Sequence, residues 1–146
     1  MAIATNKGFW VYALYPHFMK KIWRAIDGGL KLAQMIGISN ILLLIPTGDN
    51  PAYRADNVIL WDDKHLTSQL IDVTQDGSEV LSASYANDTY FIGKLDCLYV
   101  LKFNIHVHEK ITQIGPCENP RGIHSVSTTV NNKFCVATPN KDVGNV

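Results

Sequence analysis

The sequence predicts an all-β fold built from propeller-type blades, and three observations lead to that prediction. Short apolar runs rich in Val, Ile, Tyr, Phe and Thr, the residues that strands prefer, recur along the whole chain. Turn-forming residues separate these runs about every 8–12 residues, as in sandwiches, barrels and propellers. Residues 8–12, 57–61 and 96–100 resemble one another at a spacing close to one WD40-type blade of about 40–45 residues.

The apolar runs give the predicted strands in chain order. Turn residues bound most of them: the first two runs flank residues 6–8, and later runs end at residues 48–51, 62–63 and 75–77. The predicted strands are residues 2–4, 11–12, 41–45, 58–61, 70–73, 80–85, 89–92, 98–103, 111–114, 123–126 and 134–137.

Residues 18–26 and 30–38 suit either a helix or a strand by their apolar pattern. Phe18, Ile22 and Ile26 lie four residues apart, as on one helical face, and the turn at Gly28 and Gly29 could end either element. The repeat favours strands, because three further strand-like runs between successive copies give four strands per unit, as in a propeller blade.

Composition describes a folded chain with little charge. The 146 residues carry 13 Lys and Arg against 13 Asp and Glu, with 18% charged and 47% apolar residues. Charged residues normally make up about 25% of a globular domain, so some apolar surface here is expected to lie against something else. Zero net charge argues against a strongly basic nucleic-acid-binding protein.

No membrane span, signal peptide or disulfide framework is expected. The longest apolar run, residues 41–45, is far shorter than the about 20 residues that span a bilayer. Cys97, Cys117 and Cys135 are odd in number and lack metal-ligand spacing, so they are interpreted as small buried hydrophobic residues in a reducing, cytoplasmic setting.

Two pairs of polar residues are candidate sites. His106 and His108 share one face of a strand, but nothing near them in sequence completes a metal site, so a solvated strand edge is favoured. Asp62 and Asp63 are adjacent, so they face opposite ways and are interpreted as a strand end that enters a turn.

A third group, Lys20, Lys21 and Arg24 beside Trp23, has the chemistry of a nucleic-acid or membrane patch. In a neutral chain, three such charges more often form a solvated edge. The sequence contains no nucleophile, Walker or Cys/His motif, so it predicts no catalytic residue, metal site, cofactor or enzymatic activity.

The chain resembles the PROPPIN family, called WIPI proteins in animals: WD-repeat, phosphoinositide-binding propellers of autophagy. One ordered pattern of the family runs from "NILALVGGG" through a proline to "NKVIIWDD". It is matched here, in that order, by residues 40–44, 48–51 and 58–63. Residues 79–83 resemble "EVRAV", residues 119–122 resemble "NPKGLC", and residues 4–9 resemble the "ATxxGFxIY" pair. The matches follow family order and cover nearly the whole chain.

The resemblance implies a ring of about seven blades, of which this chain matches about three to three and a half. The expected blades are an incomplete first at 1–27, a second at 28–75, a third at 76–117 and the start of a fourth at 118–146. Such a chain falls just short of the smallest closed ring, at about four blades.

Membrane binding in the family depends on an Arg-Arg-Gly motif whose two arginines serve separate pockets for phosphatidylinositol 3-phosphate or the 3,5-bisphosphate. The arginines here, Arg24, Arg54 and Arg121, are isolated from one another in sequence. We therefore expect no lipid-binding residue in this chain. Peripheral association with autophagic or endosomal membranes is expected of a full-length parent.

The resemblance also implies partner binding. Family members bind a lipid-transfer protein of autophagy through loops of the first three blades, and one of these loops matches Asn50, Pro51, Tyr53 and Arg54. The family's "NTDP", "LRRDR" and "GGG" turns are replaced here by residues 13–16, 85–89 and 47–49. The alternative is an interaction module or truncated paralogue without lipid binding, either completed by another chain or non-functional.

Overall fold

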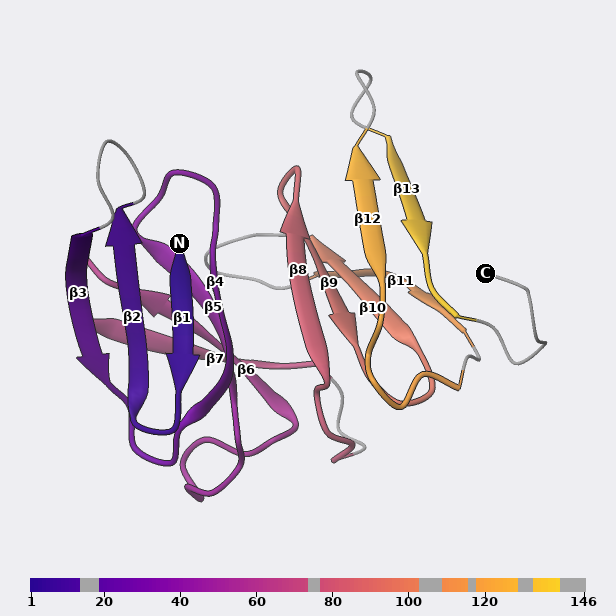
Figure 1. Ribbon diagram of the computed structural model, residues 1–146. Coiled ribbons are helices and arrows are strands. Elements are labelled where there is room, and N and C mark those ends of the chain that lie inside the picture. The colour runs from indigo at the N-terminus through magenta and orange to yellow at the C-terminus, as the bar shows by residue number, and fades with distance from the viewer. Residues whose placement is uncertain (14–18, 74–76, 103–108, 116–117, 129–132, 140–146) are drawn as a thin grey trace. The chain divides into compact units, whose positions relative to one another are not determined.

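The computed structural model describes residues 1–13, 19–73, 77–102, 109–115, 118–128 and 133–139, and every regular element among them is a β-strand (Figure 1). The strands fall into two compact units, residues 1–77 and residues 78–146. No helix in the described part of the chain is long and apolar enough to cross a membrane.

The first unit contains two antiparallel sheets. One has the strand order β1 (Ala2–Thr5), β2 (Gly8–Ala13), β3 (Met19–Ala25). The other has the order β4 (Leu30–Met35), β5 (Ile41–Pro46), β6 (Asn57–Asp62), β7 (Thr67–Asp72). Each strand pairs with the next one in the chain, which is the meander found in a propeller blade.

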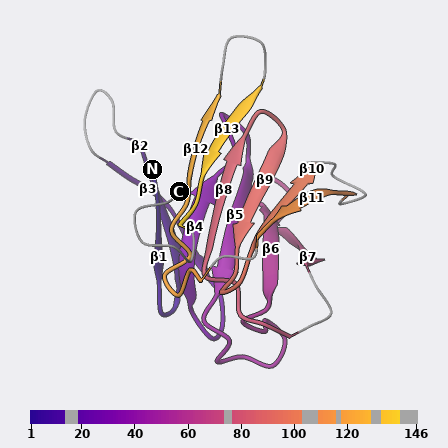
Figure 2. The ribbon, with the colours of Figure 1, turned by 90° about the vertical axis from the view of Figure 1, so that its right-hand side faces the viewer.

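The second unit repeats the four-stranded meander. Its larger sheet has the order β8 (Ser82–Ala86), β9 (Thr89–Gly93), β10 (Leu98–Lys102), β11 (Glu109–Ile114). A separate hairpin follows, formed by β12 (Ser125–Thr128) and β13 (Phe134–Ala137). Figure 2 shows β12 beside β8, and the two strands are in contact.

The two ambiguous segments form strands β3 and β4. In β3, Trp23 lies opposite Trp10, and the ring centroids of these two residues are 4.4 Å apart. Cross-strand aromatic pairs stabilise a sheet, and only the extended form of residues 19–25 makes this one. Long-range pairing, which a local apolar period does not record, therefore decides these elements in favour of strands.

The core of the first unit lies between its two sheets. Phe9, fully buried on β2, meets the ring of Trp61 on β6 edge to face, with centroids 6.0 Å apart. The other buried members are Ile26, Leu30, Leu42, Leu44 and Ile59. Alternation along β2 and β5 sends these residues to one face of each sheet, so that the two sheets pack against each other.

The second unit has a smaller core, formed by Phe91, Leu98 and Val100. Val126 and Val136 of the β12–β13 hairpin pack against it, as does Phe134, whose ring lies 5.3 Å from that of Phe91. The hairpin is therefore attached to the sheet by apolar contacts as well as by the contact between β12 and β8.

One expectation about the cysteines is wrong. Cys97 is buried as predicted, but Cys135 is exposed. It lies on β13, a strand of a sheet with only two strands, so nothing in the described residues covers its outer side. Cys117 lies outside the described residues.

The predicted all-β class and the four-stranded units are confirmed by the β4–β7 and β8–β11 sheets. The sheets span residues 2–25, 30–72, 82–114 and 125–137. Division of the chain into blades at residues 27, 75 and 117 stays a prediction.

Candidate functional site

The loop between β5 and β6 carries the four residues predicted to contact a partner. Its first part is fixed to the turn that precedes β4. The Thr47 N–H donates to the Gly29 carbonyl at 3.2 Å, and the Thr47 hydroxyl contacts the Gly28 carbonyl and the Asp49 carboxylate. Gly28 has a φ of +87°, and a Cβ there would lie 2.5 Å from the Asn50 Cβ, so the close approach requires glycine.

Asn50 shapes the tip of the loop. Its Oδ1 accepts the Ala52 N–H at 2.9 Å, and its carbonyl accepts the Tyr53 N–H at 2.9 Å. Such a side-chain bond to the backbone two residues on is an Asx-turn. The Asn50 Nδ2 donates to the Asp27 carbonyl at 3.3 Å, so Asn50 holds both the tip and the neighbouring turn. Pro51 and Ala52 are exposed at the tip.

The second half of the loop is anchored by Tyr53 and by an ion pair. Tyr53 is half-buried against the core of the first unit. The Arg54 guanidinium contacts both oxygens of Asp56, with an Nε to Oδ1 distance of 3.0 Å. Asp56 is 5% exposed, whereas the Arg54 side chain is largely exposed. The loop thus presents a proline, an alanine and a guanidinium already paired with a carboxylate.

A hollow of about 390 Å³ lies beside the loop and shares the Asp27–Gly28 turn with it. The hollow combines an indole, a carboxamide and side chains of opposite charge, so its lining is amphipathic and not predominantly cationic. Its lining residues are Asn6, Lys7, Trp23, Ala25, Ile26, Asp27 and Gly28. Sequence reasoning missed it; its one signal was the Gly28–Gly29 pair, interpreted as a turn, which the structure confirms.

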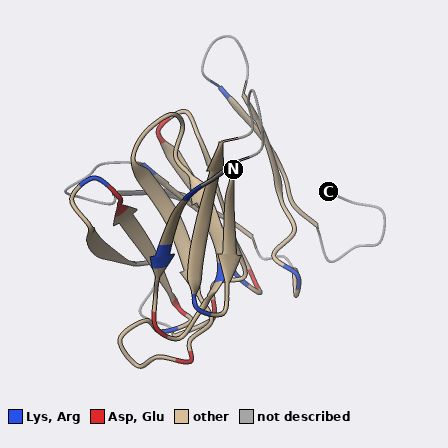
Figure 3. Cartoon of the chain, turned by 60° about the vertical axis from the view of Figure 1, so that its left-hand side comes forward, with Lys and Arg blue, Asp and Glu red and all other residues tan. Residues whose placement is uncertain are grey.

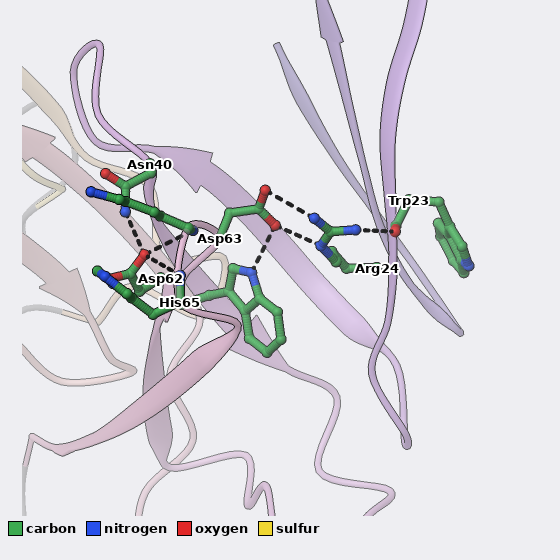
Figure 4. Close-up of polar contacts among 8 residues, drawn as sticks. Trp23, Arg24, Asn40, Asp62, Asp63 and His65 are labelled. Carbon is green, nitrogen blue, oxygen red and sulfur yellow. Dashed lines mark hydrogen bonds and ion pairs between the residues drawn. The ribbon is translucent and has the colours of Figure 1, made fainter.

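The adjacent carboxylates Asp62 and Asp63 have separate partners, as Figure 4 shows. Asp62 ends β6 and accepts hydrogen bonds from Asn40, from the His65 ring at 2.7 Å and from the N–H groups of Lys64 and His65. The His65 side-chain bond is the largest of the effects that lower the pKa of Asp62 to about 2. The prediction of a strand end that enters a turn is confirmed.

Asp63 joins the two sheets of the first unit. Its carboxylate accepts the Arg24 Nε–H at 2.7 Å and a second Arg24 N–H at 3.2 Å, and it also accepts the Trp61 Nε1–H at 3.1 Å (Figure 4). Such a two-bond arginine–carboxylate pair is geometrically specific. Its position, with Arg24 on β3 and Asp63 after β6, makes the pair a structural link.

The possible basic patch around residues 20–24 is not assembled as a free cationic surface. Arg24 is paired with Asp63, and Trp23 is stacked on Trp10. Lys21 is exposed. Figure 3 shows acidic and basic residues interspersed at turns and strand ends, with few on the strands themselves. His106 and His108 lie outside the described residues, and no metal-binding group is found among the residues that the structure describes.

Relatives among curated proteins match nearly the whole chain. SVP1-like protein 2 of Schizosaccharomyces pombe is 26% identical over 144 residues, which are 99% of this chain and 38% of that protein. Autophagy-related protein 18e of Arabidopsis thaliana is 32% identical over 146 residues, again 99% of this chain and 38% of the relative. This chain therefore spans less than two fifths of the length of these relatives. No protein-family model matches the chain.

Solved structures of Hsv2 proteins share the fold of this chain. Hsv2 of Kluyveromyces lactis superposes with a TM-score of 0.64 over 78% of this chain and 32% of that one, at 16% identity. Hsv2 of Kluyveromyces marxianus gives a TM-score of 0.64 over 78% of this chain and 35% of that one, at 19% identity.

These matches support the assignment of the chain to the PROPPIN family. PROPPINs are non-enzymatic β-propellers that serve autophagy as phosphoinositide-binding scaffolds, and they are peripheral membrane-associated proteins of the cytoplasm. The sequence-based recognition of the family and the propeller fold are both confirmed.

Within this chain, the structure brings Asn50, Pro51, Tyr53 and Arg54 together in one turn. Asn50 and Tyr53 build the turn, whereas Pro51 and Arg54 are exposed on it. Their role in binding a partner is a proposal.

Proposed function

We propose that this PROPPIN chain is a non-catalytic scaffold that contributes protein binding rather than lipid binding. The observation that carries the proposal is the commitment of two of its three arginines. Arg24 is paired with Asp63, and Arg54 with the buried Asp56. A phosphoinositide headgroup needs arginines that are free to form bidentate bonds with phosphate. The third, Arg121, lies in a turn of the second unit.

Liposome flotation tests the lipid part of the proposal. We expect the 146-residue protein to stay with the unbound fraction on vesicles with and without phosphatidylinositol 3-phosphate or the 3,5-bisphosphate. A domain known to bind the 3-phosphate lipid serves as the positive control. Salt-sensitive flotation that requires either phosphoinositide would contradict the proposal, because counterion release is the signature of phosphate binding.

The protein-binding part of the proposal places an autophagy lipid-transfer protein on the β5–β6 loop. In support, the tip at Pro51 and Ala52 is exposed on a loop held rigid by Asn50, and rigid loops lose little entropy on binding. The hollow beside the loop would receive a side chain of the partner. For a full-length parent, the same scaffold would associate peripherally with autophagic or endosomal membranes.

Substitution at the tip tests this assignment without disturbing the anchors of the loop. We expect Ala52→Arg, which adds bulk and charge at an exposed position, to weaken binding of the lipid-transfer protein by about tenfold or more. Arg54 is unsuitable for this test because its loss would leave the buried Asp56 unpaired. Ser68→Arg, at an exposed position on β7, is the matched control. Equal binding by both variants would exclude the loop.

A second candidate function is a partial propeller completed by another chain. The outer face of the β1–β3 sheet favours it. A row of cross-strand neighbours crosses this face, with Ile3 on β1, Trp10 on β2 and Trp23 on β3. The ring of Tyr12 lies next to that of Trp10. Ile3 is 39% exposed, and the three aromatic residues are half-buried. Light scattering tests this function: we expect self-association or co-elution with another β-sheet protein, and a folded monomer in every condition would exclude it.

A further inference from the structure

A histidine–serine cluster joins the turn before β12 to strand β8 in the second unit. The His124 Nε2 lies 2.7 Å from the Ser84 hydroxyl, and the Nδ1 lies 3.0 Å from the Ser82 hydroxyl. Ser82 and Ser84 are two residues apart on β8, so their hydroxyls share one face of the strand and receive both nitrogens of a single ring. The half-buried ring thereby connects segments about 40 residues apart in sequence.

The turn that carries His124 is held by its own hydrogen bonds. Asn119, only 3% exposed, donates from Nδ2 to the Ile123 carbonyl at 2.7 Å and accepts the Ile123 N–H at 2.8 Å. Its N–H also donates to the Leu95 carbonyl at 2.8 Å. Gly122 has a φ of +60°, and a Cβ there would lie 2.6 Å from the Leu81 Cβ. The turn is therefore closely seated at the start of β8, and the ring position is fixed.

The partners of the ring define which nitrogen holds its proton. Ser82 donates its hydroxyl hydrogen to the Gly122 carbonyl, so the Ser82 oxygen acts as an acceptor toward His124. The Nδ1–H then donates to Ser82, with the Gly122 carbonyl 3.2 Å away as a second acceptor. The Nε2 is left to accept the Ser84 hydroxyl hydrogen. One neutral tautomer satisfies all of these bonds.

A second proton on the ring disrupts this arrangement. An Nε2–H would face the Ser84 hydroxyl hydrogen, so Ser84 would have to turn that hydrogen away and accept the Nε2–H instead, which takes the ring nitrogen away as acceptor of the hydroxyl hydrogen. The ring makes no hydrogen bond to a carboxylate among the described residues that could stabilise a cation. The groups facing it are hydroxyls of β8 and the Gly122 carbonyl. Gly93 of β9 also approaches the ring, since a Cβ there would lie 3.5 Å from the His124 Nδ1, and Lys94 follows it in the chain. The charged residues nearest to His124 in sequence are Arg121, Glu118 and Lys133.

We propose that His124 is a pH-sensitive clasp that holds the β12–β13 hairpin on the β8–β11 sheet when the ring is neutral and loosens it when the ring is protonated. Burial, opposed by the Gly122 carbonyl, lowers the pKa of His124 below its ordinary value of 6.5. Because the folded pKa is depressed, the clasp contributes its full stability above pH about 6.5. That contribution is lost as the pH falls through the folded pKa.

Amide hydrogen exchange on the full 146-residue chain tests the proposal. Between pH 7.5 and 5, after correction for intrinsic exchange rates, we expect protection in residues 119–128 to fall several-fold. The strands β9 and β10 should change less, since their protection comes from the sheet itself. A parallel NMR titration should give a His124 pKa below 6.5. A His124 pKa at or above 6.5, or unchanged protection once the ring is protonated, would overturn the proposal.

Two variants separate the clasp from general acid sensitivity. His124→Gln keeps an amide acceptor near Ser84 and cannot titrate in this range, so its 119–128 segment should lose the pH dependence. His65→Gln removes an exposed histidine of the first unit and should leave the pH dependence of 119–128 intact. Loss of the effect in His65→Gln, or its persistence in His124→Gln, would contradict the assignment. If His124→Gln does not fold, the wild-type titration and exchange decide.

Discussion

At the residue scale, the Asp63 carboxylate, directly after β6, forms an ion pair that links the two sheets of the first unit. The Asp63 carboxylate is 14% exposed and the Arg24 side chain 32% exposed, so the pair is only partly screened by water. Asp63 also accepts the indole N–H of Trp61. Removal of this one carboxylate leaves three N–H donors, on two side chains, without their acceptor. Unsatisfied donors cost more than a lost surface contact.

We expect Asp63→Ala to lower the free energy of unfolding by about 1–3 kcal/mol, because the Arg24 guanidinium and the Trp61 N–H both lose their acceptor. Urea denaturation followed by tryptophan fluorescence measures the change. Lys21→Ala, an exposed position on the same strand as Arg24, is the control and should change stability by no more than about 0.5 kcal/mol. Similar losses in the two variants would show that the pair contributes nothing specific.

The Asp62 carboxylate predicts a pH dependence of its own. Bonds from His65, Lys64 and Asn40 lower its pKa from 3.8 to about 2. Because the folded pKa is the lower one, Asp62 stabilises the fold above pH about 3.8 and loses this contribution as the pH falls toward 2.

Asp62→Asn should therefore flatten the dependence of the unfolding free energy on pH between pH 4 and 2. The reason is that an asparagine side chain does not titrate in this range. Thermal denaturation across this range measures it. Asp27→Asn, at an exposed aspartate whose carboxylate makes no hydrogen bond or ion pair among the described residues, is the matched control. A wild-type slope retained in Asp62→Asn would refute the assignment.

At the element scale, the β5–β6 loop depends on the turn before β4. Gly28 and Gly29 let this turn approach Asn50 and Asn6 so closely that added side chains would collide with them. The sequence marked a turn at this place. Contact between the turn and a loop about 20 residues later depends on the packing of β4 against β5, which brings the two together.

Gly28→Ala should lower the free energy of unfolding by about 1–3 kcal/mol, through a left-handed φ and a Cβ placed 2.5 Å from that of Asn50. Gly37→Ala is the matched control, since Gly37 also has a positive φ, +55°, but nothing lies within 4 Å of its Cβ position. Its cost should be the conformational part alone, about 1 kcal/mol. Chemical denaturation of both variants measures the difference. Equal costs would mean that the contact with Asn50 is unimportant.

At the scale of the whole molecule, the balance of charge is the dominant property. The 13 basic and 13 acidic residues cancel, and the isoelectric point is about 6.9. Apolar side chains such as Ile3, Leu66, Leu95 and Ile123 are exposed. A neutral protein with exposed apolar residues lacks the repulsion that keeps molecules apart.

We therefore expect a solubility minimum near pH 7, with higher solubility about two pH units to either side. Precipitation assays across pH 5–9 at low salt measure it. Added salt at pH 5 or 9 should lower the solubility, because it screens the net charge. A protein that is most soluble at its isoelectric point would contradict the argument that charge limits association.

Much of the fold followed from local patterns, and the candidate site followed only in part. Strand-forming residues and regular turns predicted the sheets, and the matched motifs predicted the family. The β5–β6 loop residues were named from the resemblance, but their division into anchors, Asn50 and Tyr53, and exposed residues, Pro51 and Arg54, needed the structure. Burial of all three cysteines was predicted and is wrong for Cys135, because an edge position is not visible in local sequence.

Local patterns in the sequence were enough to predict the all-β class, the four-stranded repeat and the family, because strand propensity, turn chemistry and motif order are local properties of the chain. The repeat also favoured strands for β3 and β4, which the structure confirms. The Arg24–Asp63 link and the His124 cluster with Ser82 and Ser84 came from the tertiary structure. Each of the two links joins side chains about 40 residues apart. Packing of consecutive sheets sets such contacts, and no local period encodes them.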